Sequence, residues 1–153
     1  MNKMYLQIGD WSDDGHGKYE KFLLKTNKSV KEIQEAYKKS VKITGVSFDN
    51  NSNKKYQICT EYGESIIYKE SLDILKNFIN FSNDDLEYFT MNEEQENKNI
   101  FYYIDIDFFV DLWIKFVKIS IPDLKIKIIS DNDIPVINGY GDLNVQFGYG
   151  FFS

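Results

Sequence analysis

The sequence predicts one α+β domain spanning residues 1–153, in which a mainly antiparallel sheet carries helices packed chiefly on one face. Three observations favour this class. The chain has 153 residues, about the length of one ordinary domain. Hydrophobic residues make up 42% of it, enough to fill a core. Short segments of alternating apolar and polar residues are interspersed with segments of helical periodicity, which is the pattern of an α+β fold.

The strands expected in the first half of the chain form two hairpins. Residues 4–8 alternate apolar and polar side chains, and residues 18–26 follow after a polar loop, so the two segments predict a hairpin with a long connection. Residues 56–62 and 65–68 predict a second hairpin around Gly63.

The clearest helix is predicted over residues 27–45. Ser29 and Glu32 have the spacing of a capping box, in which each side chain bonds the other residue's backbone N–H. Gly45 is a suitable stop because glycine tolerates the left-handed conformation that ends many helices. A shorter helix is predicted over residues 71–81, with Leu72, Leu75 and Ile79 facing inward.

Residues 82–99 are acidic and rich in asparagine, with few large apolar side chains. They predict a short helical turn over residues 84–89 and then a solvated acidic loop over residues 91–99. A domain boundary at this place is the alternative interpretation. The next segment predicts the central helix, which ends before Pro122. Its apolar residues recur at helical spacing: Phe108, Phe109, Leu112, Trp113, Phe116 and Val117.

The start of that central helix is ambiguous in the sequence, since residues 100–106 alternate as a strand does. Residues 124–130 predict a further strand. Residues 134–153 predict a closing hairpin with Asn138 and Gly139 in its turn, because this dipeptide favours the tight turns of hairpins.

After the first strand, Asp10, Ser12 and Asp14 stand at alternate positions and Gly15 follows them. This pattern resembles the start of the calcium loops of EF-hand and related proteins. Alternate side-chain oxygens followed by a glycine converge on one ion in such loops. Lys21 stands where an EF-hand has its bidentate glutamate, and the flanking segments have strand character, so a calcium-type loop on a hairpin is the expectation. The alternative is a polar loop whose Asp and Ser side chains bond nearby backbone. The candidate ligands for Ca²⁺ are Asp10, Ser12, Asp14, His16 (through its carbonyl) and Glu20.

No set of residues predicts a catalytic centre by its spacing. His16 beside Asp13 or Asp14 has the composition of a general base, but no nucleophile accompanies it. Cys59 lies in an apolar strand and is expected to be a small core residue. Three further acids begin the central helix, where carboxylates complement the helix dipole: Asp105, Asp107 and Asp111.

Charge excludes some partners and favours others. The net charge is −6, and all 18 basic residues are lysine, so the chain lacks the planar guanidinium that reads phosphates and base edges. We therefore expect no nucleic acid as a partner. No membrane is expected either, because no uninterrupted apolar run approaches membrane-spanning length. A protein with a basic surface is the expected partner. The first residues have no apolar signal-peptide core, which predicts a cytoplasmic protein, with leaderless secretion as the alternative.

Three hypotheses for function follow. The first is a small acidic non-enzymatic binding protein that inhibits or neutralises a protein partner, as toxin-immunity and anti-defence proteins do. The second is a divalent-metal module that uses residues 10–20, and the third is an enzyme with an acid and histidine site in that loop. The residues expected to contact a protein partner are Asp13, Asp14, Glu93, Glu94 and Glu96.

Overall fold

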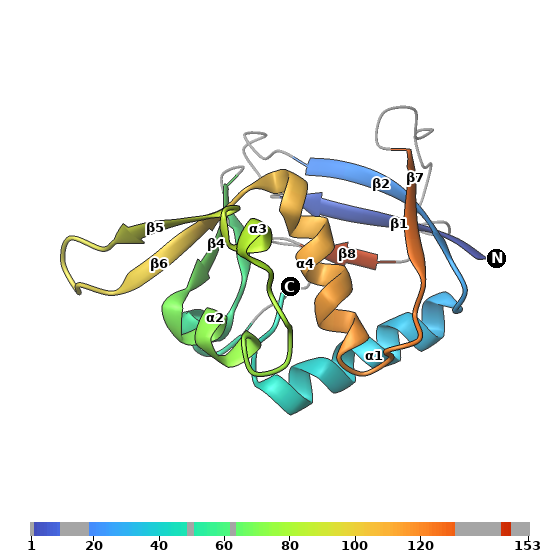
Figure 1. Cartoon of the computed structure of the whole chain (residues 1–153), viewed down its shortest axis with the longest axis horizontal. Helices are drawn as coiled ribbons and strands as arrows, with labels where there is room; N and C mark the ends of the chain where they lie inside the picture. The colour runs from blue at the N-terminus through green and yellow to red at the C-terminus, as the bar shows by residue number, and fades with distance from the viewer. Residues whose placement is uncertain (1, 10–18, 49–50, 62–63, 131–144, 148–153) are drawn as a thin grey trace.

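The residues that the structure describes form two four-stranded sheets with helices around and between them (Figure 1). One sheet has the strand order β7-β2-β1-β8 and the other has the order β3-β4-β6-β5. The predicted α+β class with mainly antiparallel pairing is confirmed. Packing of the helices on one face is not confirmed, since one buried core joins the helices to strands of both sheets. The computed structural model describes residues 2–9, 19–48, 51–61, 64–130 and 145–147.

The first sheet is built on the predicted N-terminal hairpin. β1 (Asn2–Gly9) and β2 (Tyr19–Thr26) pair antiparallel along their whole length, from Asn2 opposite Thr26 to Gly9 opposite Tyr19. β7 (Ile126–Ser130), a predicted strand, pairs antiparallel with β2 and forms one edge of the sheet.

The last described strand joins this sheet through a pairing that the sequence did not predict. β8 (Val145–Phe147) pairs with β1 in parallel, so within the described residues the end of the chain adds to the N-terminal strand. The predicted turn at Asn138 and Gly139, and the first half of that predicted hairpin, lie outside the described residues. A parallel pair requires a long connection rather than a tight turn, and local turn signals do not reveal it.

α1 (Val30–Thr44) has the termini that the sequence predicts. The Ser29 hydroxyl accepts a hydrogen bond from the Glu32 N–H at 3.1 Å, and Glu32 Oε1 accepts one from the Ser29 N–H at 3.2 Å. Gly45 ends the helix with a φ of 77°, a conformation that costs little only for glycine. The buried side of α1 contains Ile33 and Tyr37.

The second sheet contains the predicted hairpin around Gly63. β3 (Cys59–Glu61) and β4 (Glu64–Tyr68) pair antiparallel, and β4 pairs on its other side with β6 (Ile100–Ile104). The strand predicted to begin at Tyr56 starts later, because the 3₁₀-helix η1 (Lys54–Tyr56), capped by the Asn53 side chain, precedes it.

Two short helices follow the second hairpin. α2 (Lys69–Leu75) ends earlier than the predicted limit of residue 81, but Leu72, Leu75 and Ile79 are buried as expected. α3 (Asn83–Leu86) is the predicted helical turn, and a capping box between Ser82 and Asp85 closes its start.

The predicted solvated loop over residues 91–99 is wrong in part. β5 (Phe89–Glu93) pairs antiparallel with β6, so residues 91–93 lie in a strand and the loop is shorter. The acidic and asparagine-rich composition hides this strand because Glu and Asn have low strand propensity, whereas the pairing comes from the aromatic strand beside it.

α4 (Ile106–Lys118) is the predicted central helix, and it lies between the two sheets (Figure 1). Its apolar side packs into one continuous core with residues from α1, β2, β4 and α2. Phe116 lies 5.7 Å from Tyr37 and 5.1 Å from Phe48 between ring centroids, so α4 and α1 meet through aromatic contacts. The fully buried α4 residues include Phe109, Leu112, Trp113, Phe116 and Val117.

Candidate functional site

The predicted calcium ligands fall mainly outside the described residues. Asp10, Ser12, Asp14 and His16 lie in the segment 10–18, as does Asp13 from the expected partner surface. Glu20 lies in β2, opposite Ile8. Within the described part of the chain, no group of three or more His, Cys, Asp or Glu side chains has the arrangement of a metal site. The calcium hypothesis therefore stays a prediction.

Calcium should raise the melting temperature if the alternating acids of this loop are ligands, because a ligand that binds only the folded state stabilises it by mass action. Asp10→Ala should abolish the rise, whereas Asp84→Ala, in the exposed turn of α3, should leave it unchanged. The measurement is thermal unfolding with and without millimolar calcium. An unchanged melting temperature and no heat of binding in calorimetry would remove the hypothesis.

The β5–β6 hairpin projects from the body of the described structure at one end (Figure 1). Its ladder continues past the strands, because the Glu94 N–H donates to the Asn99 carbonyl at 2.9 Å. Residues 95–98 then form a four-residue turn. Lys98 closes the turn at a φ of 58°, the left-handed conformation that often ends such turns. The hairpin is thus a defined structure rather than a solvated loop.

β5 is an edge strand, and its outer edge is open in the described structure. Hydrogen-bonded pairs alternate along an antiparallel ladder. The Asp105 N–H donates to the Tyr88 carbonyl at one end and the Glu94 N–H donates to Asn99 at the other. The backbone groups of Phe89, Met91 and Glu93 must therefore point away from β6. An edge of this kind is able to pair with another strand.

Met91 adds apolar surface to this edge. Its side chain is 68% exposed, the highest value among the large hydrophobic side chains described. Tyr88 is 42% exposed and stacks flat on Phe108, with 4.9 Å between ring centroids and 3° between planes. An exposed methionine on a strand edge is a typical anchor for a protein partner.

The three expected partner-binding glutamates have different environments on the hairpin. The Glu94 carboxylate accepts hydrogen bonds from the Tyr68 hydroxyl at 2.6 Å and the Asn99 amide at 3.2 Å, so it fastens the base of the turn to β4. Glu93 and Glu96 are exposed, and Lys98 lies 3.9 Å from Glu93, a distance at which an exposed pair contributes little. Glu93 and Glu96 are therefore free to contact a partner directly, whereas Glu94 contributes its negative charge from a fixed position.

The hydrogen bond from Tyr68 lowers the pKa of Glu94 below its ordinary value of 4.5, and the Asn99 and Asn97 side chains act in the same direction. A carboxyl whose pKa is lowered by folding stabilises the protein above its unfolded pKa, and this stabilisation is lost as the pH falls through the folded pKa. Tyr68→Phe should move the Glu94 titration upward, toward 4.5. A carboxyl titration followed by NMR in the parent and the variant measures this shift, and an unchanged Glu94 titration would contradict it.

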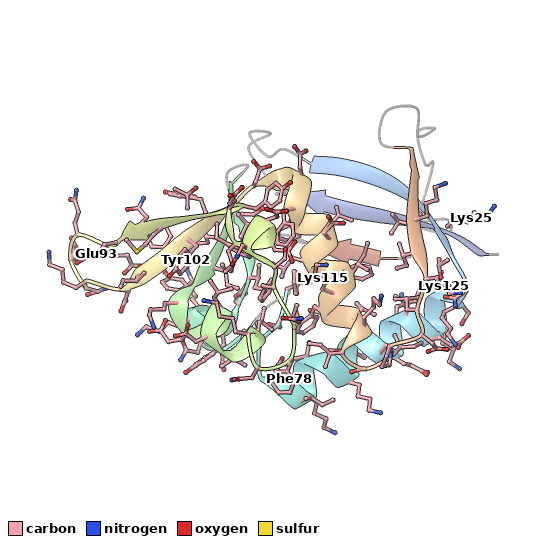
Figure 2. All side chains as sticks on the ribbon, in the orientation of Figure 1. Lys25, Phe78, Glu93, Tyr102, Lys115 and Lys125 are labelled. Atoms are coloured by element: carbon pink, nitrogen blue, oxygen red, sulfur yellow. The ribbon has the colours of Figure 1, made fainter. Side chains whose placement is uncertain are left out.

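Charge is divided between two regions of the molecule. Residues 82–111 contain nine acidic residues and one lysine, whereas residues 25–44 and 114–127 together contain ten lysines and three acidic residues. Figure 2 places Glu93 at one end of the molecule and Lys25 and Lys125 at the other. The net charge of −6 conceals this division, which counting charges over shorter segments would have revealed.

The remaining sequence candidates have structural explanations or fall outside the description. The Asp105 carboxylate accepts a hydrogen bond from the Asp107 N–H at 3.0 Å, so Asp105 is the N-cap of α4 as the sequence predicts. Cys59 begins β3, and its side chain lies outside the described residues. Sequence reasoning missed Met91 because a single methionine in an acidic segment gives no periodic signal.

Among the described residues, every helix is too short or too polar to cross a membrane. The candidate site consists of the β5 edge, Met91 and the exposed acids of the hairpin. Comparisons with models of known protein families, with curated proteins and with solved structures find no match to this chain.

Proposed function

We propose that this chain is a small acidic binding protein that captures a basic protein partner through the β5–β6 hairpin and thereby inhibits or neutralises it. The observation that carries the proposal is the exposed Met91 on an open edge strand. The edge offers backbone hydrogen bonds, Met91 offers an apolar anchor, and Glu93 and Glu96 supply attraction at a distance. The hairpin inhibits the partner where it covers a basic surface that the partner needs for its activity.

The charge distribution supports a basic partner over an acidic or neutral one. The acidic residues 82–111 include the hairpin and α3, and a partner that approaches this end first meets a field of one sign. Such a field raises association rates for an oppositely charged protein and disfavours acidic competitors. The hairpin projects from the body, which lets it enter a concave surface (Figure 1).

Affinity capture from extracts of the native cell tests the proposal. The unaltered chain should recover one dominant protein with a basic surface. Met91→Lys removes the apolar anchor and adds a positive charge to the hairpin, so it should lose this protein. Ile43→Lys makes the same change at an exposed isoleucine of α1, with 47% of its side chain exposed, and should retain it. Equal recovery by both variants would contradict the proposal, as would turnover of a small molecule that depends on Asp10 or His16.

A further inference from the structure

A second open edge lies at the opposite, lysine-rich end of the molecule. β7 is the terminal strand of the first sheet, and β2 occupies one of its edges. The Asn27 N–H donates to the Lys125 carbonyl at 3.2 Å, and the Lys125 N–H donates to Asn27 Oδ1 at 2.8 Å. Because bonded pairs alternate, the backbone N–H and carbonyl of Ile126 point toward the other edge. In the described structure no strand pairs there.

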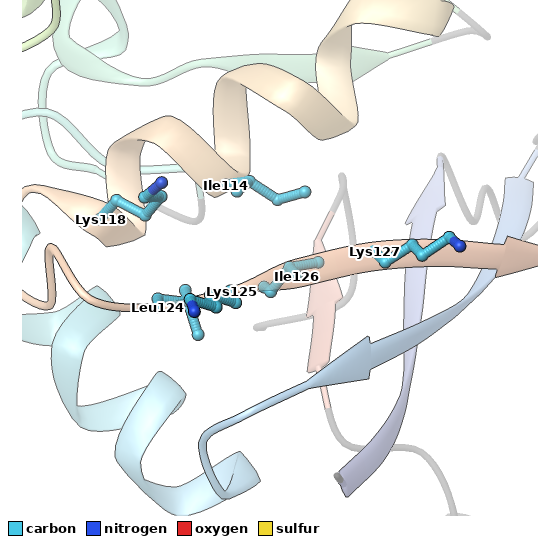
Figure 3. Close-up of a pocket in the computed structure, with 6 residues that line it drawn as sticks. All are labelled: Ile114, Lys118, Leu124, Lys125, Ile126 and Lys127. Atoms are coloured by element: carbon cyan, nitrogen blue, oxygen red, sulfur yellow. The ribbon is translucent and has the colours of Figure 1, made fainter.

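A hollow of about 290 Å³ lies along this edge, between the start of β7 and α4 (Figure 3). Four consecutive residues at the start of β7 line one side of it. Consecutive side chains of a strand point to opposite faces of a sheet, so a hollow that contacts all four must lie at the edge of the strand. Two α4 residues four positions apart, and so on one side of the helix, line it from above. The lining residues are Ile114, Lys118, Leu124, Lys125, Ile126 and Lys127.

The apolar part of the hollow lies on one face of the sheet. Ile126 is paired with Thr26, which is fully buried, so this face is the one that packs against the helices. A strand added beside β7 would place the side chain opposite Ile126 on the same face, next to Ile114. The volume is at the lower end of the range of about 300–1,000 Å³ for small-molecule pockets, and it suits a single apolar side chain better.

The lysines lie where such a strand would place its other side chains. Lys127 lies directly opposite Lys25 on the other face, and both are exposed. Like charges opposite each other destabilise a sheet. Among the described residues, no carboxylate forms an ion pair with Lys118, Lys125 or Lys127. Acidic side chains opposite Lys125 and Lys127 would relieve this repulsion.

Lysines on an edge strand also protect it against pairing with copies of itself. That role explains the charge on β7, but it does not explain a hollow with an apolar floor directly beside it. The absence of arginine, together with the apolar lining, disfavours nucleic acid as the occupant. The hollow and the alternating lysines fit an extended chain that alternates acidic and apolar residues.

From these observations we propose that the free edge of β7 binds an extended acidic peptide segment of a partner protein, which adds to the sheet as a strand. Its acidic residues pair with Lys125 and Lys127, and its intervening apolar side chain enters the hollow beside Ile114. This mode of recognition takes affinity from backbone hydrogen bonds and specificity from the pocket. The inference is independent of the function proposed for the hairpin, which lies at the other end of the molecule.

The probe is a labelled peptide of four glutamates alternating with three valines, titrated against the full chain. Three comparison probes separate the contributions. A peptide with the same residues in blocks tests the alternation, an alternating peptide with methylated backbone nitrogens tests strand addition, and a twelve-nucleotide thymidine strand tests nucleic acid. We expect binding of the alternating peptide, with affinity at least about tenfold weaker for each comparison probe.

Two variants of the chain locate the site. Ile114→Trp fills the hollow. Lys125→Gln with Lys127→Gln removes the two exposed charges that pair with the acidic residues and does not touch the core, so this variant decides the result if Ile114→Trp does not fold. Each should weaken binding about tenfold or more. Ile43→Trp and Lys38→Gln with Lys39→Gln make matched changes on the exposed side of α1 and should change affinity less than about twofold.

Four results would overturn the inference. The first two are binding of the peptide by the folded variants as tight as by the parent chain, and binding of the methylated peptide as tight as that of the unmethylated one. The third is tighter binding of the oligonucleotide than of the peptide at the same lysines. The fourth is self-association of the chain, seen in sedimentation as a dependence on concentration, that the lysine variant abolishes. The last result would identify the acidic β5 edge of a second copy as the occupant. Glu93→Gln with Glu96→Gln should leave peptide binding unchanged, which separates this test from that of the hairpin.

Discussion

Trp113→Ala should lower the free energy of unfolding by roughly 3–5 kcal/mol, as removal of a large buried aromatic side chain commonly does. Trp113 is fully buried on α4, in the core that links α4 to both sheets. Removing the indole leaves a cavity, because α1 and the strands around it are held by their own packing and do not close the space. Chemical denaturation of the parent and the variant measures the difference.

A matched change on the exposed side of the same helix provides the control. Asp111→Ala should change the free energy of unfolding by less than about 0.5 kcal/mol, because an exposed side chain without buried contacts contributes little. A Trp113→Ala variant that unfolds at the same denaturant concentration as the parent would mean that α4 does not organise the core in solution.

The elements with strong local signals were the ones that the sequence predicted well. α1 has its capping box and Gly45 at the expected positions, and the apolar periodicity of α4 identified Trp113 and Phe116 as core residues. These signals are local because hydrogen bonds to a helix terminus and the spacing of one helical face involve residues a few positions apart. No long-range information is needed to recognise them.

Pairing over long distances was beyond the reach of these signals. The division into two sheets depends on β7 joining β2 and on β8 joining β1, each across about 100 residues or more of sequence. A further example is the hydrogen bond between the Ser40 and Ser120 hydroxyls at 2.7 Å, which joins α1 to the end of α4. In the sequence, neither serine differs from an ordinary polar residue, so nothing indicates the contact between them.

The candidate sites were predicted only in part. The sequence identified Glu93, Glu94 and Glu96 as a group, and the structure gathers them at the end of one hairpin. It did not indicate that Glu94 is bound by Tyr68, that Met91 is exposed on an open edge, or that lysines gather around β7. Those properties arise from pairing between strands, so they appear only once the fold is known. The calcium loop over residues 10–20 stays a prediction.

Association of the hairpin with its basic partner should be strongly dependent on salt, and this is the largest kinetic effect that we expect. Raising the salt concentration from 50 to 500 mM shortens the distance over which charges act from roughly 14 Å to roughly 4 Å. Attraction between exposed charges then contributes little until the proteins touch. The association rate should fall by about tenfold or more, whereas dissociation changes much less, because contacts already formed are only partly screened.

The charges responsible can be located by substitution. Glu93→Gln with Glu96→Gln removes two exposed charges from the hairpin and leaves the Tyr68–Glu94 hydrogen bond in place. This variant should associate more slowly at low salt, depend less on salt, and unfold at the same temperature as the parent. Glu35→Lys changes the net charge by the same amount on the exposed side of α1, far from the hairpin, and should keep most of the parent's association rate. If both variants slow association equally, net charge rather than the hairpin directs the encounter, and β5 and Met91 lose their role as the place where the partner first binds.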